Sequence, residues 1–448
     1  MKKFLPILKK TAFAFFFVII TTTVANAATY FSIANGNWNV NTTWSLTSGG
    51  AAVGAGVFPI AGDIVTIEGG DNVTIPAGFS AFCTTLNVAN STVFATGTLT
   101  FAATASLAVS GNITVGFAGS TSREGTINMA AGGTLTCAGN VTIGNDGTSA
   151  AIASEITQGA GSIVNVTGNV SIITPGNNFT NRWAVNDGTA SITGTLTMAN
   201  TGGANQDCAF SVSTGTATIT GAVTMNGAAN ENLLSVTGAG TLNLGNSISA
   251  ANGTFTLGAG STVNYTGTAQ TLRATTTYQN LIVSGSGAKT TTGVTIAAAG
   301  RLSMQGTATI TAAPTYTAGA TLEYAGSGAQ TSTNTEFAAA GGPTNLIINN
   351  TNDVTLHAAR TITALTLTNG NLIIPTASTR LTITSTAAIG GSGFDANKCI
   401  VTQVNTGTGA TAFVRVSLPA AGARTIPVGD GTNYLPVTLT PANANSFD

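Results

Sequence analysis

Apolar and polar residues alternate over short stretches along most of the chain, and turns rich in glycine and asparagine separate these stretches. Strict alternation occurs in residues 134–137, 140–143, 216–220 and 361–368. A period of two residues indicates β-strands with one buried face, and the abundant Thr and Val are β-branched residues that fit a pleated surface. No stretch shows a sustained helical period with capping residues. The pattern therefore predicts an all-β protein.

One phrase recurs along the middle of the chain as SGNITVG, AGNVTIG, TGNVSII, TGTLTMA and TGAVTMN. Its glycines are Gly111, Gly139, Gly168, Gly194 and Gly221, with a weaker copy at Gly245. A drifting period of about 27 residues is expected when coils are stacked and their loops vary in length. Each strand would then pair in parallel with its copy one coil away, at about 4.8 Å. We predict a right-handed parallel β-helix, or β-solenoid. Tandem β-sandwiches are the alternative, although they would not explain the period.

The repeat unit lengthens in the second half of the chain. Residues 260–267 match 319–326, and residues 278–283 match 343–348. We interpret this unit as two coils or slightly more. Prolines become more frequent near the end, which predicts a different β module that continues beyond Asp448. The predicted division is a signal peptide (1–27), a cap with the first coils (28–95), regular coils (96–259), coils with the longer two-coil repeat (260–390) and the start of the distinct module (391–448).

The N-terminal segment from Met1 to Ala27 resembles an export signal. Four lysines precede an apolar run at 12–20, and Ala25-Asn26-Ala27 has the small-x-small pattern of a signal-peptidase site. We expect cleavage after Ala27 and a secreted or outer-cell-surface protein. The apolar run is too short for a comfortable membrane span, and no later segment reaches spanning length. We therefore expect no transmembrane segment after cleavage.

Charge and cysteine content narrow the function classes. Charged residues make up 6% of the chain, with 14 Lys and Arg against 15 Asp and Glu. There is no basic face for nucleic acid. The hydrophobic fraction of 43% argues against disorder. Four widely spaced cysteines do not form a zinc pattern. We expect them to be small buried hydrophobic residues, although a disulfide is possible in an exported protein. They are Cys83, Cys137, Cys208 and Cys399.

Two groups of residues resemble known families. The pattern W-x5-W, then P-x-x-GD-x-V-x-I, then G-x-x-V is similar to the eight-glycine β-domain at the head of many exported proteins. The later Tyr-x-Asn-Leu and Tyr-x-Gly-x-x-x-Gln-Thr phrases resemble large repeat-rich surface and secreted proteins of the bacterial type IX secretion class. These resemblances imply a fold and a location rather than an activity. The residues concerned are Trp38, Trp44, Pro59, Gly62, Asp63, Val65, Ile67, Gly70 and Val73 for the first, and Tyr265, Gln270, Thr271, 278–281, Tyr324, Gln330, Thr331, Asn345 and Leu346 for the second.

Few residues suggest catalysis. His357 is the only histidine, so a Ser-His-Asp or Cys-His device would have to use it; we expect a turn or surface residue. Asp63, Glu68 and Asp71 form the closest group of acids, and polysaccharide hydrolysis needs two carboxyl groups about 5–10 Å apart. We expect this group to be structural, with the Asp63 side chain holding a Gly-Asp turn by hydrogen bonds to the backbone. No catalytic or cofactor-binding residue is assigned.

Two further sites are considered. Acids recur at Glu155, Asp187, Asp207 and Glu231, and a Ca²⁺ ion could bind if Asp187 and Asp207 stacked one coil apart. Threonine pairs resemble the flat ladders of ice-binding solenoids, which require such pairs at one coil position in successive coils. These pairs are Thr98/Thr100, Thr134/Thr136, Thr195/Thr197, Thr216/Thr218, Thr307/Thr309 and Thr382/Thr384.

The sequence favours a non-catalytic secreted or cell-surface solenoid that acts as a stalk, adhesin or matrix component. Its partners would be glycans, surface polysaccharide or other copies of the chain. A carbohydrate-active β-helix protein, or the scaffold of one, is the alternative. An ice-binding solenoid is the minor alternative.

Overall fold

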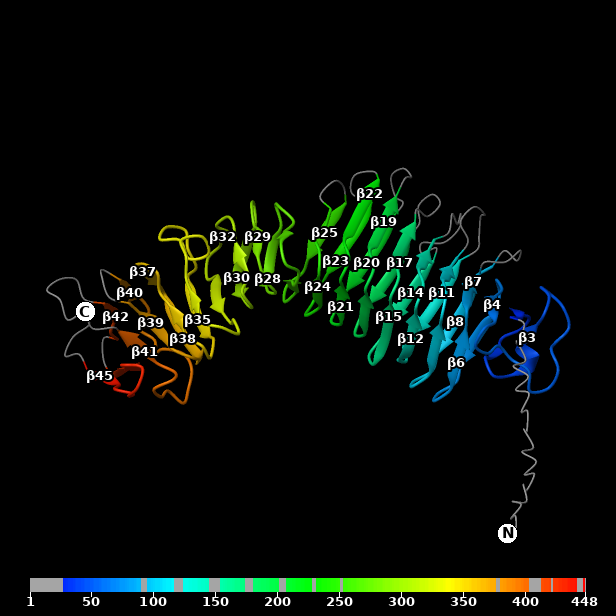
Figure 1. The fold of residues 1–448 in the computed structure, drawn as a ribbon, viewed down its shortest axis with the longest axis horizontal. Coiled ribbons are helices and arrows are strands. Elements are labelled where there is room, and N and C mark those ends of the chain that lie inside the picture. Colours follow the sequence, from blue (N-terminus) through cyan, green and yellow to red (C-terminus); the bar gives the residue numbers. More distant parts are fainter. Residues whose placement is uncertain are drawn as a thin grey trace, which may run out of the picture.

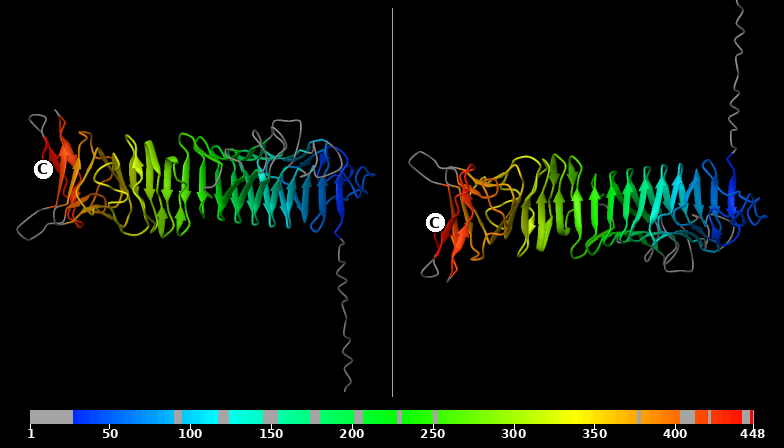
Figure 2. Two further views of the ribbon diagram at one scale, coloured as in Figure 1. Left: turned by 90° about the horizontal axis from the view of Figure 1, so that it is seen from above. Right: turned by 90° about the horizontal axis from the view of Figure 1, so that it is seen from below.

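The chain forms an elongated, gently bent rod built from short strands (Figure 1). This computed structural model describes residues 27–89, 95–116, 124–144, 154–173, 180–200, 207–227, 231–249, 253–375, 379–402, 412–419, 422–440 and 446–447. The predicted signal peptide, apart from Ala27, lies outside the described residues. Successive coils follow one another along the rod, as the views from above and from below show (Figure 2).

Three long sheets run along the rod, and each coil contributes one strand to each sheet in turn. Sheet A contains β1 (Thr29–Ser32), β3 (Trp44–Ser45), β4 (Ile64–Ile67), β7 (Thr85–Val88), β10 (Ile113–Val115), β13 (Val141–Ile143), β16 (Val170–Ile173), β19 (Leu196–Asn200) and β22 (Val223–Gly227). Sheet B contains β2 (Gly36–Asn37), β5 (Asn72–Ile75), β8 (Gly97–Phe101), β11 (Gly125–Met129), β14 (Glu155–Gln158), β17 (Thr180–Val185), β20 (Asp207–Val212), β23 (Asn232–Val236) and β25 (Thr254–Leu257). Sheet C contains β6 (Ser80–Cys83), β9 (Ser106–Val109), β12 (Gly133–Cys137), β15 (Ser162–Val166), β18 (Thr189–Ile192), β21 (Thr216–Ile219), β24 (Thr241–Leu244), β26 (Thr262–Tyr265), β28 (Thr277–Val283), β30 (Thr295–Met304), β32 (Thr315–Tyr316), β33 (Thr321–Tyr324), β35 (Asn345–Asn349) and β38 (Ala364–Asn369).

Shorter sheets replace sheets A and B in the second half. Sheet D contains β27 (Gln270–Thr271), β29 (Ala288–Thr290) and β31 (Thr309–Ile310). Sheet E contains β34 (Gln330–Thr331), β36 (Val354–Thr355), β39 (Leu372–Ile374), β41 (Ile400–Thr402) and β44 (Val428–Gly429). Sheet F contains β37 (Arg360–Ile362), β40 (Arg380–Ile383), β42 (Phe413–Ser417) and β46 (Ser446–Phe447), while β43 (Arg424–Ile426) pairs with β45 (Val437–Leu439). The single short helix in the described residues is the 3₁₀ turn η1 (Asn41–Thr43).

Parallel pairing between coils confirms the predicted β-solenoid. For example, Ile113 lies beside Val141, Val141 beside Val170, and Val170 beside Leu196. Antiparallel pairs among the named strands occur only at the two ends, as β1 with β3, β42 with β46 and β43 with β45. A sandwich would need antiparallel hairpins throughout, so the tandem-sandwich alternative is wrong.

The recurring glycine of the repeat stacks on itself from coil to coil. The amide of Gly139 donates to the carbonyl oxygen of Gly111 at 3.0 Å, and Gly168 and Gly194 continue the ladder at 3.1 and 3.2 Å. A β-carbon on Gly168 would lie 2.3 Å from the carbonyl oxygen of Gly139. The glycine is therefore required because the neighbouring coil's backbone occupies the space of a side chain.

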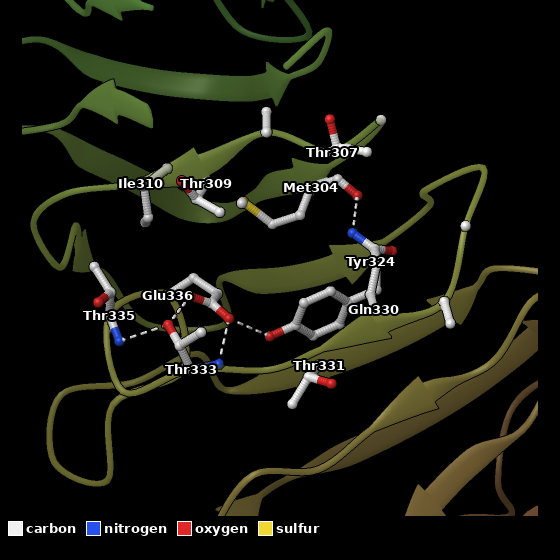
Figure 3. Close-up of a pocket in the computed structure, with 14 residues that line it drawn as sticks. Met304, Thr307, Thr309, Ile310, Tyr324, Gln330, Thr331, Thr333, Thr335 and Glu336 are labelled. Atoms are coloured by element: carbon white, nitrogen blue, oxygen red, sulfur yellow. Dashed lines mark hydrogen bonds between the residues drawn. The ribbon is translucent and has the colours of Figure 1, made fainter. Parts of the chain in front are cut away.

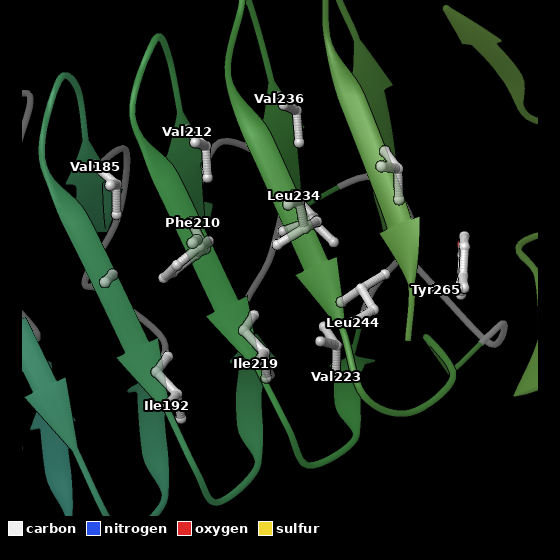
Figure 4. Packing of buried hydrophobic residues seen from close by; sticks show 14 of the residues in the cluster. Val185, Ile192, Phe210, Val212, Ile219, Val223, Leu234, Val236, Leu244 and Tyr265 are labelled. Atoms are coloured by element: carbon white, nitrogen blue, oxygen red, sulfur yellow. The ribbon is translucent and has the colours of Figure 1, made fainter. Parts of the chain in front are cut away.

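The alternation of apolar and polar residues along the strands determines which side chains form the core. On most strands the apolar residues point inward and the Thr, Asn and Ser residues point outward, so that inward side chains form columns along the rod. Figure 4 shows such columns from Val185 through Val212 to Val236, and from Ile192 through Ile219 to Leu244. Burial of these columns is the main stabilising contribution of the fold.

The longer repeat unit spans three coils, each of which contains fewer residues than a coil of the first half. These shorter coils are called narrow coils, and those of the first half are called wide coils. Thr262 of β26 lies beside Asn280, Asn280 beside Arg301, and Arg301 beside Thr321 of β33. Each of these steps covers fewer residues than a coil of the first half, such as the one from Thr134 to Ile163. The prediction of two coils was wrong because it assumed that the wide coil continued.

The N-terminal cap places two tryptophans in the core, as expected for a capping segment. Trp38 and Trp44 are fully buried with ring centroids 5.2 Å apart. The Trp38 indole donates to the carbonyl oxygen of Pro59 at 3.3 Å, and the Trp44 indole donates to that of Trp38 at 2.7 Å. β3 then pairs antiparallel with β1, so the cap covers an open end of sheet A.

Antiparallel pairing at the C-terminal end begins later than residue 391. β41 and β42 still add in parallel to sheets E and F. The different arrangement starts with β43 and β45, where Arg424 lies beside Leu439. The predicted boundary therefore falls inside the solenoid, since proline density rises before the coil stacking ends.

Candidate functional site

A cavity lies in the narrow coils, between β31, β33 and β34 (Figure 3). Its volume is about 390 Å³. Tyr324, Gln330 and Glu336 supply its polar wall, and Met304 and Ile310 supply its apolar wall. This combination of an apolar wall with a few polar groups is typical of a small-molecule site.

Glu336 is buried in this wall, and hydrogen bonds occupy its carboxylate. The Tyr324 hydroxyl donates to Oε1 at 2.9 Å, and the amide of Thr333 donates to the same oxygen at 2.5 Å. The Thr333 hydroxyl donates to Oε2. Burial and the adjacent carboxylate raise the pKa of Tyr324 well above its usual value, so the phenol stays protonated. These groups are already bonded to one another, which leaves little capacity for a ligand.

The two tyrosine phrases of the sequence share one structural role. After Tyr265, the Gln270 side chain accepts a hydrogen bond from the amide of Gly267 and donates to the carbonyl oxygen of Leu244. After Tyr324, Gln330 makes the same two bonds, with the amide of Gly326 and the carbonyl oxygen of Met304. The glutamine therefore joins each coil to the preceding one.

The two phrases differ in the partner of the tyrosine. Tyr265 and Tyr278 are buried, with their hydroxyl oxygens 2.9 Å apart. Tyr324 has the Glu336 carboxylate in that place, because Pro343 stands where the second copy of the phrase would carry an aromatic residue. The cavity lies beside this exchanged partner (Figure 3).

His357 is part of a hydrogen-bonded cluster that the sequence did not reveal. Its Nδ1 lies 2.6 Å from the Ser332 hydroxyl, and its Nε2 lies 3.0 Å from Oδ1 of Asn334. Arg360 also donates to Asn334. Burial and the neighbouring guanidinium lower the pKa of His357, so the imidazole is neutral at pH 7.

The arrangement of Ser332 and His357 does not make the Ser332 hydroxyl a catalytic nucleophile. Ser332 is 1% exposed, and its hydroxyl oxygen accepts the amide of His357 at 3.1 Å. A nucleophile must reach substrate and have a base oriented toward it. The cluster instead joins β34 to the segment between β36 and β37. Ser332 and Asn334 could not be found from sequence because they belong to the preceding coil and meet His357 only through coil stacking.

The acids near the N-terminus tie the cap to the first coil. Asp63 accepts the amides of Ala28 and Ile60, both at 2.9 Å, which confirms its predicted turn role. The Ser32 hydroxyl donates to Asp71 at 2.6 Å and accepts the amide of Glu68 at 2.8 Å. Oε1 of Glu68 is buried without a hydrogen-bond partner.

The acids of the middle region do not stack as a Ca²⁺ site requires. Asp207 begins β20 and lies beside Thr180, whereas Asp187 follows the other end of β17 and accepts the Thr214 hydroxyl. The two acids are separated by most of a strand, about 20 Å. Asp187 and Asp207 therefore do not meet the condition of stacking one coil apart that a Ca²⁺ site required, and Glu155 pairs with Arg182 at 2.6 Å. Glu231 precedes β23, and its carbonyl oxygen accepts the amide of Cys208. Across the described ranges, no group of three or more His, Cys, Asp or Glu residues could hold a metal ion.

The threonine pairs do not form one ladder. Thr134/Thr136 and Thr216/Thr218 lie on sheet C, three coils apart. The other four pairs belong to strands, or flank strands, of sheets B, A, D and F. On sheet C from β18 to β26, however, the outward positions that stack from coil to coil are occupied by Thr, Ser or Asn. A search for Thr-x-Thr alone does not find such mixed columns.

All four cysteines are buried free thiols, as expected for small hydrophobic residues. Cys83 and Cys137 both lie beside Val109, so they are two coils apart and cannot be bridged. Burial raises the pKa of the Cys137 and Cys399 thiols to about 11. They are therefore protonated and unreactive at neutral pH.

The part of the chain that the structure describes contains no helix long and apolar enough to cross a membrane. No protein-family model matches the chain, and no curated protein or solved structure matches it.

Proposed function

We propose that the chain is a non-catalytic secreted or cell-surface β-solenoid that serves as a stalk, adhesin or matrix component. The observation that carries this proposal is the long rod, whose sheet C has an uncharged outer face over many successive coils. On sheet C the outward positions from β6 to β28 carry no charged side chain. A repeat rod separates its two ends and offers the same surface along its length.

The ionisable groups support a structural role. Glu155 and Arg182 pair with each other, Arg301 lies 3.4 Å from Glu323, and Asp63 holds a turn. Each group is bonded within its own neighbourhood, and the sites lie at different positions along the rod. The two converging carboxyl groups that a glycoside hydrolase needs are not among these contacts.

Export and surface display can be tested directly. The full gene would be expressed in a gram-negative host, followed by cell fractionation and N-terminal sequencing of the recovered protein. We expect the mature chain to begin at Ala28 and to appear outside the cytoplasm. A protein that keeps Met1 and stays in the cytoplasm would contradict the proposal.

The carbohydrate-active alternative has its own assay. Incubation with a panel of soluble polysaccharides, followed by detection of new reducing ends or unsaturated products, would show cleavage. We expect none above the rate of a heat-denatured control.

The ice-binding alternative is favoured by one stretch of sheet C. Four successive coils there place two polar residues in register: Thr189/Ser191, Thr216/Thr218, Thr241/Asn243 and Thr262/Asn264. Inhibition of ice recrystallisation by micromolar protein would support this function. Normal growth of the ice crystals would rule it out.

A further inference from the structure

A shallow depression crosses four coils of sheet C near its N-terminal end, with a volume of about 310 Å³. Phe82 lies beside Ala108, Ala108 beside Thr136, and Thr136 beside Asn165, so each coil from β6 to β15 contributes one outward residue. A second row of turn residues runs parallel to this column. At about 4.8 Å per coil, the column is about 14 Å long. The outward lining consists of Ala61, Phe82, Ala108, Ser110, Thr136, Ala138, Asn165 and Thr167.

Side-chain size explains why the sheet is hollowed here. Ala108, Ser110 and Ala138 are the small outward residues of the two central coils, whereas Phe82 and Asn165 stand at the two ends. Cys83, Val109 and Cys137 form the floor. Since burial keeps both thiols protonated, raising the pKa of Cys137 to about 11, the floor is apolar and uncharged.

Three polar side chains of the depression are available to a ligand, unlike those of the Glu336 cavity, whereas the Thr136 hydroxyl donates to the carbonyl oxygen of Leu107 at 3.4 Å. Asn165 and Thr167 are exposed, and their side chains make no hydrogen bond to another described residue. Ser110 is likewise exposed at the rim. An amide both donates and accepts, and a hydroxyl does the same. Such groups suit a ligand that carries many hydroxyls.

Phe82 supplies the apolar part of the site. Its side chain is 46% exposed, which makes it one of the few large hydrophobic residues on the outer surface of the three long sheets. The face of an aromatic ring attracts the partly positive C–H groups of a sugar ring. No charged side chain lines the depression, so nothing there would neutralise an acidic sugar.

We propose that this depression binds a neutral glycan of several sugar rings, with one ring stacked on Phe82 and the hydroxyls of the following rings bonded to Ser110, Thr167 and Asn165. The inference rests on the proposed function, because it assigns the ligand class through which an extracellular solenoid would adhere. A chain of sugar rings lying along the rod axis would cross one coil for roughly every ring.

Affinity electrophoresis tests the proposal. The mature chain, residues 28–448, would migrate through gels that contain dextran, mannan, galactan, a soluble β-1,4-glucan or a soluble β-1,3-glucan, with alginate as an acidic comparison. We expect retardation by at least one neutral polysaccharide and none by alginate. Phe82→Ala should weaken binding on the order of tenfold, and Phe82→Trp should preserve it.

A matched pair of variants places the site. Ala138→Tyr fills the depression, whereas Thr220→Tyr adds the same ring at the same turn position three coils away. Both positions are exposed, and circular dichroism would verify that both variants fold. We expect loss of binding for Ala138→Tyr alone.

The outcomes separate this inference from the proposed function. Binding that survives Ala138→Tyr, stronger binding to alginate, or no retardation by any neutral polysaccharide would overturn the glycan site while leaving an exported rod intact. Cytoplasmic retention in the fractionation experiment would overturn the proposed function whatever the gels show.

Discussion

The wide coils from β4 to β24 and the narrow coils from β26 to β39 close the same rod in different ways. On sheet C a wide coil leads from Thr134 to its neighbour Ile163, whereas a narrow coil leads only from Thr262 to Asn280. Within the wide coils themselves, the connection between sheets A and B varies in length. The connection from β13 to β14 occupies residues 144–154, but the connection from β22 to β23 occupies only residues 228–231.

The interiors of the two regions differ accordingly. The wide coils are filled by apolar columns, with Gln158 as a buried polar exception that accepts the Trp183 indole at 2.8 Å. In the narrow coils, Lys289 and Arg360 are buried and donate to backbone carbonyl oxygens rather than to carboxylates. The third side of these coils consists of strands of two or three residues. Long polar side chains therefore satisfy carbonyl groups that a longer strand would have paired.

The largest expected effect is in the wide coils. Trp183→Ala removes a fully buried ring that lies against Phe210 and leaves Gln158 without its donor. We expect a loss of about 4 kcal/mol in the free energy of unfolding. Because coils interact mainly with their neighbours, hydrogen exchange should accelerate around β14, β17 and β20 and remain slow in the narrow coils. Uniform acceleration would show that the two regions unfold as one unit.

The second-largest loss of stability is expected from removing the buried charge of Lys289 in the narrow coils. Lys289→Met keeps the length of the side chain but removes its bonds to the carbonyl oxygens of Gly267 and Thr268 and to Gln270. We expect a loss of about 2–3 kcal/mol, measured by urea unfolding, because buried acceptors lose their donor. Lys398→Met is the control and should change stability by less than about 0.5 kcal/mol. An unchanged Lys289→Met variant would mean that burial of the charge offsets its bonds.

A glycine pair compares the turns of the two regions. A β-carbon at Gly168 meets the backbone of the adjacent coil, whereas one at Gly328 meets no atom within 4 Å. Gly168→Ala should cost about 2 kcal/mol, since the ladder must shift, and Gly328→Ala should lie within about 0.5 kcal/mol of the wild type. Thermal unfolding of both variants measures the difference, and equal effects would contradict the stacking argument.

Buried thiols in the wide coils and near the C-terminal end should both lower the stability of the fold at alkaline pH, and the effect should vanish at neutral pH. In the fold, the pKa of Cys137 and of Cys399 is raised to about 11. The unfolded thiols would lose their protons first, so stability falls as pH rises above about 9. Each thiol should contribute a loss of about 2 kcal/mol at about pH 11. Cys137→Ala and Cys399→Ala should each flatten the fall of stability over this alkaline range. Slopes identical to that of the wild type would show that other groups dominate.

The sequence determined the local structure of this protein. Alternation fixes which side chains point inward, because the pleat has a period of two residues. The glycine of the repeat marks the position where coils approach most closely, and Asp63 marks its turn through a local side-chain bond. These features depend on neighbours in the chain, so a single sequence was enough to predict the solenoid and the buried thiols.

Only the tertiary structure decided which residues lie beside one another across coils. That register depends on corner connections of varying length, which carry no periodic signal. For this reason the three-coil unit after Thr262, the separation of Asp187 from Asp207, the cluster around His357 and the depression beside Phe82 could not be obtained from spacing. Backbone hydrogen bonds between coils, rather than the pattern within a strand, place these side chains together.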